Sequence, residues 1–311
     1  MNGDVLLISL YVDDIIYTSS SSVLLAQFKI DMMNTFKMTD LGLMSYFLGI
    51  EVKQNSEGFF ISQQKYIEDL LVHMNMKLCK PVSTPLAVNE KLEEGDSDKF
   101  SDPGTYRSLI GKLLYVTHTR PDIVFPVNYL SRFMNQPSKI QFIVAKRVVR
   151  YLAGTKTLGL WYSRGDDGEL EAFSDSDWGG SKADRKSTSG VFIKLGSCPI
   201  SWGSRKQDVV PLSTTEVEYI ASTGAACQVD NLSAIAVAKN PADHGRTKHI
   251  DVRYHFIRGL VSEGVISLYH CSTEDHIADI FTKPLLTEKF VMFRSLLGMR
   301  SSQSRGDVDA D

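Results

Sequence analysis

The sequence predicts an α+β region followed by an α/β region, in which a mixed sheet is flanked by helices. Two hairpin patterns, each followed by a helical pattern, occupy the first 80 residues. Three strand-like stretches between residues 170 and 204 then precede alternating helical and strand-like segments, an order that favours helices packed on a mixed sheet. With 311 residues, the chain is long enough for about two domains.

The first element is a hairpin. The segment LLISLYVDDIIYTS places β-forming residues around Asp13 and Asp14, which predicts strand, tight turn and strand. We expect a helix at about 23–34, a second hairpin at YFLGIEVKQNSEGFFIS and a helix at about 63–74. A lone hairpin is marginal in water, so partner strands for the first one are expected upstream.

Residues 80–103 form the best linker candidate, because prolines and a glycine interrupt a charged stretch. Helical patterns then run from about 106 to 152, with an interruption near Pro121. A second unit is expected to begin near residue 158, with strands at 170–174, 189–195 and 199–204. Helices are expected at about 214–226, 231–238, 252–262 and 273–281, with a strand at 265–270.

Composition excludes several classes of protein. The 34 lysines and arginines against 37 acidic residues give a net charge of −3, so nucleic-acid binding would have to depend on local patches. The four cysteines lie far apart without a CxxC pair, which argues against a zinc site or a disulfide framework. The N-terminal apolar run is cut by Asp13 and Asp14, so we expect no membrane span and no secretion.

Asp13 and Asp14 stand at the tip of the first predicted hairpin. Adjacent aspartates between strand ends can hold Mg²⁺, because a hard cation prefers oxygen ligands. The same pair is also ordinary turn chemistry, and spacing alone favours the turn.

The wider string Tyr11-Val12-Asp13-Asp14 within apolar strands resembles the YxDD motif of reverse transcriptases. FLGIE at 47–51 lies on a hairpin where that family carries its primer-grip element. YRSLIGKLLYVTHTRPDI, LSRFMNQPS and AKRVVRYLAGT resemble the region after the palm in Ty1/copia-type retrotransposon polyproteins. The resemblance implies a partial reverse transcriptase palm over 1–80 and a thumb- or connection-like helical region over 81–157.

In that family Asp13 and Asp14 would be metal ligands, and the site needs a third aspartate from an upstream strand. The sequence contains neither that aspartate nor the fingers. We therefore expect no polymerase activity from this chain alone.

The second unit holds a further carboxylate set. Converging carboxylates can bind two divalent ions, although a single acidic residue is usually just solvated. The candidates lie at the end of a strand, in a helix, at the opening of a helix and in the last helix: Asp175, Glu218, Asp230 and Asp279.

Segments from about 158 to 285 resemble the RNase H of the same family, among them AFSDSDWGG, DRKSTSGVFIKLG, LSTTEVEYIA, VDNLSAIAVAKNP and EDHIADIFTKPL. The resemblance implies that the four carboxylates are catalytic and bind Mg²⁺ or Mn²⁺. It also implies an RNA/DNA hybrid and the remainder of the Pol polyprotein as partners, and an intracellular location in the cytoplasm (virus-like particle) or the nucleus. Residues 286–311 would be a partly disordered tail.

Two of the four candidates have an acidic residue two positions away, so a physical argument must decide between the neighbours. Ser213 and Glu216 fit a capping box, which makes Glu216 structural and leaves Glu218 on another helix face. Asp175 is preferred over Asp177, which falls in a turn.

Histidines and basic residues complete the candidates. His249, Asp251 and His255 lack the spacing of a helical zinc motif, so structure or RNA-strand contact is favoured, and no catalytic histidine is assigned. Local basic groups are plausible phosphate contacts whose binding would weaken with salt: Lys146, Arg147, Arg150, Arg185, Lys186, Arg205, Lys206 and Lys248.

The sequence departs from its family between Glu218 and Asp230, which are only 12 positions apart. The family pattern continues the helix, turns and adds another strand there. A helix rising about 1.5 Å per residue uses all of these residues and leaves none for a turn and strand. We expect an internal deletion or exon-joining error that displaces Asp230, and hence a degenerate RNase H or a non-catalytic nucleic-acid-binding remnant.

Overall fold

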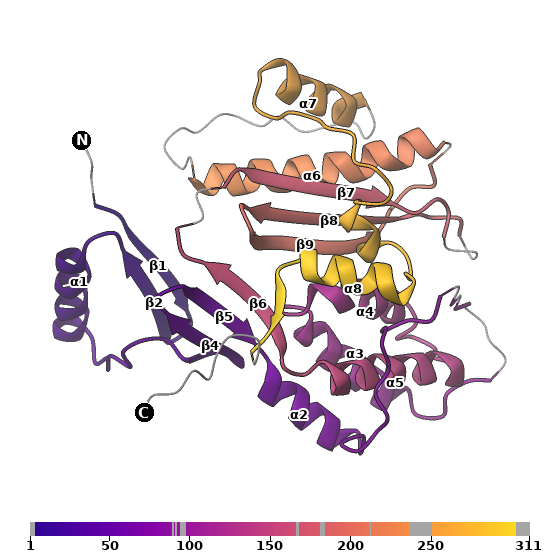
Figure 1. Cartoon of the computed structure of the whole chain (residues 1–311), viewed down its shortest axis with the longest axis horizontal. Helices are drawn as coiled ribbons and strands as arrows, with labels where there is room; N and C mark the ends of the chain where they lie inside the picture. Colours follow the sequence, from indigo (N-terminus) through magenta and orange to yellow (C-terminus); the bar gives the residue numbers. More distant parts are fainter. Residues whose placement is uncertain are drawn as a thin grey trace. The chain divides into compact units, whose positions relative to one another are not determined.

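The computed structural model describes residues 4–88, 90, 92–93, 98–165, 168–180, 184–211, 213–236 and 251–302, without the side chains of 230–236 and 251–256. The chain divides into two compact units, Met1–Val52 and Lys53–Asp311. Figure 1 labels their helices and strands. In the described part, no helix is both long and apolar enough to cross a membrane.

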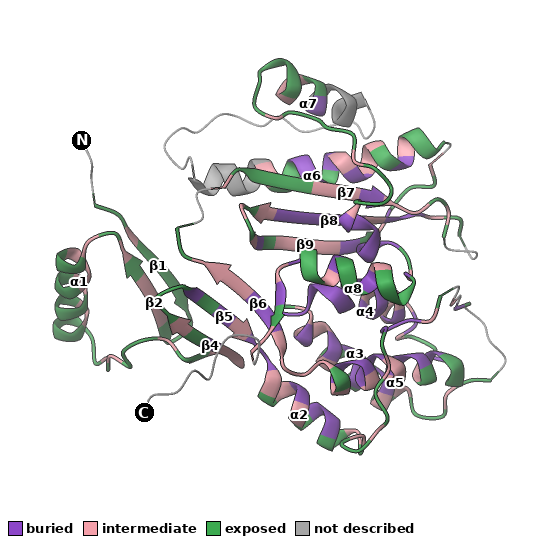
Figure 2. Cartoon of the chain, viewed as in Figure 1, coloured by how far each residue is buried: buried purple, intermediate pink, exposed green. Residues whose placement is uncertain are grey.

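The first unit contains the predicted N-terminal hairpin. Strands β1 (Leu6–Tyr11) and β2 (Asp14–Ser19) pair antiparallel. Helix α1 (Ser22–Thr35) begins after Ser21, whose side chain accepts the Leu24 N–H. Strand β3 (Tyr46–Phe47) pairs with the start of β4 (Ile50–Asn55), which crosses into the second unit. No residue of α1 is buried, so this unit has little core of its own (Figure 2).

The second unit has a helical core. Helices α2 (Gln64–His73), α3 (Pro103–Val116), α4 (Val124–Ser131) and α5 (Lys139–Gly154) pack their apolar faces together. The predicted interruption is confirmed as a 3-10 turn, η1 (Pro121–Ile123), because proline supplies no N–H to continue the preceding helix. Helix α5 begins with a capping box between Ser138 and Gln141. Figure 2 shows buried residues concentrated in these helices.

A charged network is buried within this core. Arg120 and Asp122 are both fully buried, and the Arg120 guanidinium donates two hydrogen bonds, 2.9 and 2.8 Å long, to the Asp122 carboxylate. Arg120 also donates to the Thr155 carbonyl at 2.9 Å, and the Tyr151 hydroxyl donates to Asp122 at 2.5 Å. Burial raises the pKa of Tyr151, as do the charge and hydrogen bond of Asp122. The network fixes η1 against the end of α5.

One sheet joins distant parts of the chain. Strand β6 (Leu158–Ser163) lies between β5 (Gly58–Ser62) and β10 (Met299–Ser301). The stretch at residue 158, where we expected a second unit to begin, thus pairs with the second hairpin. Residues 286–302, expected to belong to a tail, form α8 (Thr287–Leu296) and β10, because Phe293 and Leu297 are fully buried in the core.

The other sheet has the order β7-β8-β9, with β7 (Leu170–Ser176), β8 (Thr188–Leu195) and β9 (Cys198–Lys206) antiparallel. Helix α6 (Thr214–Ala236) packs along β7 and β8 (Figure 1). The 3-10 helix η2 (Ile277–Phe281) packs on the same two strands, and α7 (Asp251–Ser262) contacts α6. The fold is therefore mixed α/β with several sheets and helices.

Three secondary-structure predictions are wrong. The helices expected at 214–226 and 231–238 are one helix, because no glycine or proline separates them after Gly224. Residues 265–270 form no strand: Leu268 and Tyr269 are exposed, and β propensity without a pairing neighbour gives no sheet. The helix expected at 273–281 is only the 3-10 turn at its end.

Candidate functional site

The first carboxylate pair lies at the tip of the β1–β2 hairpin, with Asp13 in the turn and Asp14 at the start of β2. Tyr11 pairs with Asp14 across the hairpin, Val12 adopts a φ of 52°, and both Asp13 and Asp14 are exposed. No group of three or more histidines, cysteines, aspartates or glutamates is close enough to hold a metal ion within the described residues. Two exposed carboxylates alone do not make a two-metal site, so this pair does not fit the metals of a polymerase.

The second set comes from three distant segments of the second unit. Asp175 lies near the end of β7 and is 6% exposed, whereas Asp279 lies in η2 and is 1% exposed. Glu218 lies in the first half of α6. All three are near enough for the charges of Asp175 and Asp279 to act on Glu218. The fourth candidate, Asp230, has a helical backbone in α6, but its side chain is outside the described residues.

Gly190 brings η2 against the sheet. It is paired with Asp175 across β7 and β8. A Cβ on Gly190 would lie 2.7 Å from the Phe281 Cβ and 2.9 Å from the Thr282 Cγ2, closer than real Cβ contacts. Glycine at this position therefore lets the turn that carries Asp279 settle beside Asp175.

Two lysines neutralise Asp279. The Lys283 ammonium lies 2.8 Å from Asp279 Oδ1 and 3.8 Å from Asp175 Oδ2. The Lys289 ammonium lies 3.1 Å from Asp279 Oδ2 and donates to the Thr273 carbonyl at 2.8 Å. Burial alone would lower the pKa of Lys283, but the hydrogen bond to Asp279 and the surrounding carboxylates raise it overall. Both oxygens of Asp279 thus face ammonium groups.

Asp175 has two further neighbours. The Thr282 hydroxyl donates to its Oδ2, and His276 Nε2 lies 4.0 Å from its Oδ1. His276 Nδ1 is buried and has no hydrogen-bond partner within the described residues. We assigned no role to His276 from the sequence, and the structure places it beside the buried aspartate.

The surroundings of Glu218 strongly perturb its carboxyl group. Although its side chain is exposed at the surface, desolvation by the surrounding protein raises its pKa to about 7, and the negative charge of Asp175 adds to the rise. A hydrogen bond from the Ser176 backbone N–H acts in the opposite direction. The charge of Lys283 also lowers the pKa of Glu218, and the charge of Asp279 raises it.

The neighbouring acids have structural contacts. Asp177 accepts a hydrogen bond from the Thr188 backbone N–H, and burial raises its pKa to about 6. Ser213 accepts the Glu216 N–H at 3.2 Å, as the capping box requires. The choice of Asp175 and Glu218 over these neighbours remains a prediction.

The predicted basic contacts divide into two groups. On α5, two of them hold the segment before α3: Arg147 donates to Thr84 at 3.1 Å and Arg150 donates to the Lys80 carbonyl at 2.8 Å. Lys146 lies 4.6 Å from the ring centre of Phe142 on the same helix.

The second group lies at the end of β9 and in the loop between β7 and β8, and it is more accessible. Lys206 pairs with Asp184 at 2.8 Å, whereas Arg205 is 85% exposed and lies 3.9 Å from Asp208. Arg185 and Lys186 belong to this loop, and Arg185 adopts a φ of 58°. Four other candidates lie outside the described part, either wholly or with their side chains: Lys248, His249, Asp251 and His255.

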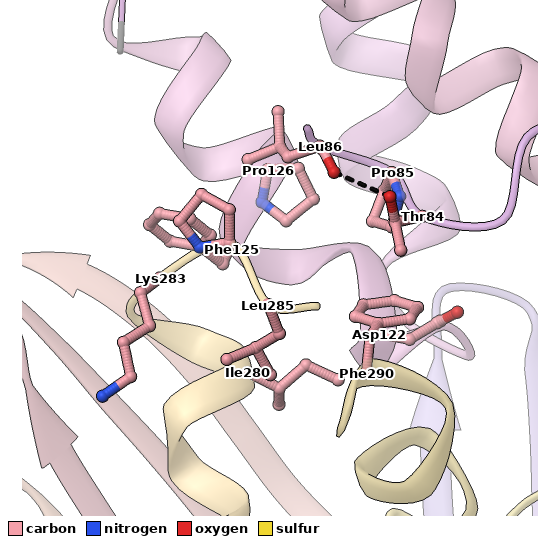
Figure 3. Close-up of a pocket in the computed structure, with 11 residues that line it drawn as sticks. Thr84, Pro85, Leu86, Asp122, Phe125, Pro126, Ile280, Lys283, Leu285 and Phe290 are labelled. Carbon is pink, nitrogen blue, oxygen red and sulfur yellow. Dashed lines mark hydrogen bonds between the residues drawn. The ribbon is translucent and has the colours of Figure 1, made fainter. Parts of the chain in front are cut away.

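Beside the carboxylates is a small pocket that is mostly apolar (Figure 3). Leu86 and Phe125 face Leu285 and Ile280 across it. Lys283 lines the pocket with its stem, while its ammonium end points away from these side chains (Figure 3). The polar chemistry of this region therefore belongs to the carboxylates and not to the pocket.

Sequence reasoning missed Lys283 and Lys289. A signal was present, because Asp279 and Lys283 are four residues apart, a spacing at which opposite charges meet on a helical turn. Lys289 gave no such signal, since it reaches Asp279 through the fold of η2 and α8.

Comparisons with known proteins place the chain in a family. A profile described as reverse transcriptase (RNA-dependent DNA polymerase) matches residues 1–88. The chain is 40% identical, over 93% of its length, to the retrovirus-related Pol polyprotein from transposon RE1 of Arabidopsis thaliana. It is 37% identical, over 96% of its length, to the corresponding polyprotein from transposon TNT 1-94 of Nicotiana tabacum. It covers only 21% and 24% of these two relatives.

A shorter relative is covered more fully. The putative transposon Ty5-1 protein of Saccharomyces cerevisiae is 34% identical over 70% of this chain and 71% of its own length. No solved structure matches the chain. The matches extend over both the hairpin with Asp13 and Asp14 and most of the remaining sequence, so the chain belongs to the copia-type Pol polyproteins of retrotransposons and contains part of their reverse transcriptase.

Proposed function

We propose that the region from about 158 to 285 is a degenerate RNase H, derived from an enzyme that cleaves RNA/DNA hybrids with two divalent metal ions. One observation carries the proposal: Asp175, Glu218 and Asp279 come from a strand, a helix and a 3-10 turn far apart in sequence, yet their charges act on one another. Perturbed carboxyl groups gathered from separate segments are typical of functional sites. Membership of the retrotransposon family supports this assignment.

The carboxylates of this site suit divalent metal ions by their chemistry but not by their arrangement. Carboxylate oxygens are the donors that Mg²⁺ and Mn²⁺ prefer. As placed, however, the oxygens of Asp279 face two ammonium groups, and no three ligands lie close enough for an ion within the described ranges. The donor types fit the metals and their arrangement does not, which supports reduced activity. Asp230 stays a proposed fourth member of the set, with its side chain outside the described residues.

The polymerase part is proposed to be inactive. Asp13 and Asp14 stand exposed at the tip of the hairpin, and among the described residues no third carboxylate lies close enough to complete a metal site with them. Residues 1–88 match the reverse transcriptase profile, so nucleic acid and the remainder of the Pol polyprotein are the proposed ancestral partners of this region. A cytoplasmic or nuclear location is proposed on the same family ground.

A non-catalytic nucleic-acid-binding remnant is the alternative. The exposed Arg205 and the loop with Arg185 favour it, because exposed cations suit phosphate contacts. In contrast, Arg147 and Arg150 are engaged with the protein itself.

A cleavage assay and a binding assay together separate the two functions. The full chain is incubated with a labelled RNA/DNA hybrid in Mg²⁺, and binding to the same hybrid is measured at several salt concentrations. Slow cleavage that Asp175→Asn abolishes supports the degenerate RNase H. Salt-sensitive binding without cleavage supports the remnant, and the absence of both contradicts both proposals.

A further inference from the structure

Positively charged lysine side chains already occupy the carboxylate site. Asp175 and Asp279 are both buried, and a buried carboxylate is costly unless it is paired. Asp279 Oδ1 faces the Lys283 ammonium at 2.8 Å, and the same ammonium lies 3.8 Å from Asp175 Oδ2. One positive group thus stands between two carboxylates from separate elements.

We infer that the ammonium of Lys283 is the resident cation of this site and competes with divalent metal ions for the oxygens of Asp175 and Asp279. The inference rests on the proposed function, since it takes these carboxylates as the metal ligands. It explains why a set of suitable donors has no arrangement that could hold an ion.

Lys283 is distinguished from the other cations nearby by its reach. Lys289 contacts Asp279 alone and shares its ammonium with the Thr273 carbonyl. His276 lies 4.0 Å from Asp175. Only Lys283, among the described cations, contacts both aspartates.

The backbone holds Lys283 in place. Its N–H donates to the Asp279 carbonyl at 3.2 Å, which closes a single turn and sets the two side chains on the same side. Pro284 follows directly, and its ring fixes φ for the chain that leaves the site. The stem of Lys283 lies against the apolar pocket and its ammonium points away from it (Figure 3). The lysine is therefore positioned by the fold and not by chance contact.

A metal ion that binds between the aspartates must displace this ammonium. If both remained, a dication and a monocation would share a partly buried site, where like charges repel more strongly than in water. Loss of the positive charge at position 283 should consequently strengthen metal binding, although it also weakens the metal-free protein because Asp279 loses a partner.

The test uses Mn²⁺ binding to the full chain, measured by the enhancement of water-proton relaxation. Lys283→Gln keeps a polar side chain without charge and should bind Mn²⁺ at least tenfold more tightly than the wild type. Lys283→Arg keeps the charge and should bind as weakly as the wild type. Lys194→Gln removes a lysine that pairs with Glu171, four residues from Asp175 along β7, and it should leave Mn²⁺ affinity unchanged.

A second measurement needs no substitution. Reductive methylation of the wild type, followed by mass spectrometry, reports the accessibility of each lysine. Saturating Mn²⁺ should increase the labelling of Lys283 relative to Lys194.

The outcomes separate the inference from the proposed function. If the wild type binds Mn²⁺ but Lys283→Gln binds no more tightly, or Lys283 labelling does not change, the inference is wrong and the proposed function stands. If neither the wild type nor any variant binds Mn²⁺, although all give cooperative thermal unfolding, both are wrong. If Lys283→Gln does not fold, the labelling result on the wild type decides.

Discussion

Replacement of Asp122 by asparagine should destabilise the second unit severely. The Asp122 carboxylate receives two hydrogen bonds from Arg120 and one from the Tyr151 hydroxyl, and both charged groups are fully buried. Removing one partner of a buried ion pair leaves the other charge uncompensated, which costs about 3–5 kcal/mol. An ordinary domain is stable by only about 5–15 kcal/mol, so this single change would remove a large part of that stability.

Urea unfolding followed by circular dichroism measures the effect. The matched control is Asp98→Asn, because Asp98 and Lys139 form a pair of the same length, 2.8 Å, with both side chains more than half exposed. That exposed pair should contribute no more than about 1 kcal/mol. A double change to Arg120→Met and Asp122→Leu removes both charges and should recover part of the loss. Equal effects of Asp122→Asn and Asp98→Asn would refute the argument that burial makes the difference.

Three further predictions concern other parts of the chain. Gly190→Ala should lower the free energy of unfolding by about 1–3 kcal/mol, measured by thermal unfolding, because the new Cβ would lie 2.7 Å from a carbon of η2. Gly203 has open space around it, so Gly203→Ala should lower this free energy less. Similar losses for the two variants would contradict the close-contact argument. The hydrogen bond from the Thr105 hydroxyl lowers the pKa of Asp102 at the start of α3. The Asp102 carboxylate therefore stabilises the fold at a pH above its pKa in the unfolded chain, and this stabilisation is lost as the pH falls through its pKa in the folded protein. Asp102→Asn keeps a capping side chain but does not titrate, so its melting temperature should fall less between pH 5 and pH 2 than that of the wild type, and parallel curves would exclude a role for this group. The purified chain should extend no primer on an RNA template, and nucleotide incorporation above the level of Asp13→Asn would show that the turn carries polymerase chemistry.

Local signals made several elements predictable from the sequence. The alternation around Asp13 and Asp14 gave the first hairpin, and Pro121 marked the break between the core helices. These features depend on residues next to one another in the chain. In the candidate site, the positions of Asp175 and Asp279 followed from their motifs, although their roles remain predictions.

The remaining elements could not be predicted because they depend on pairing between distant segments of the chain. Residues 265–270 have the composition of a strand, but a strand also needs a neighbour, and the sequence does not state which segments meet. The partners of β6 lie about a hundred residues before it and more than a hundred after it, so neither pairing could be predicted from local pattern. The position of Lys289 beside Asp279 was hidden for the same reason, since it depends on how η2 and α8 pack.

The pairing of Met299 with Leu160 also has a kinetic consequence. During synthesis, β5 and β6 emerge long before β10, so one edge of β6 has no partner until the last part of the unit leaves the ribosome. Sheet closure through such distant segments slows folding, and an open strand edge is exposed to other chains in the meantime. Ribosomes that stall before residue 299 would therefore release chains that aggregate more readily than the finished protein.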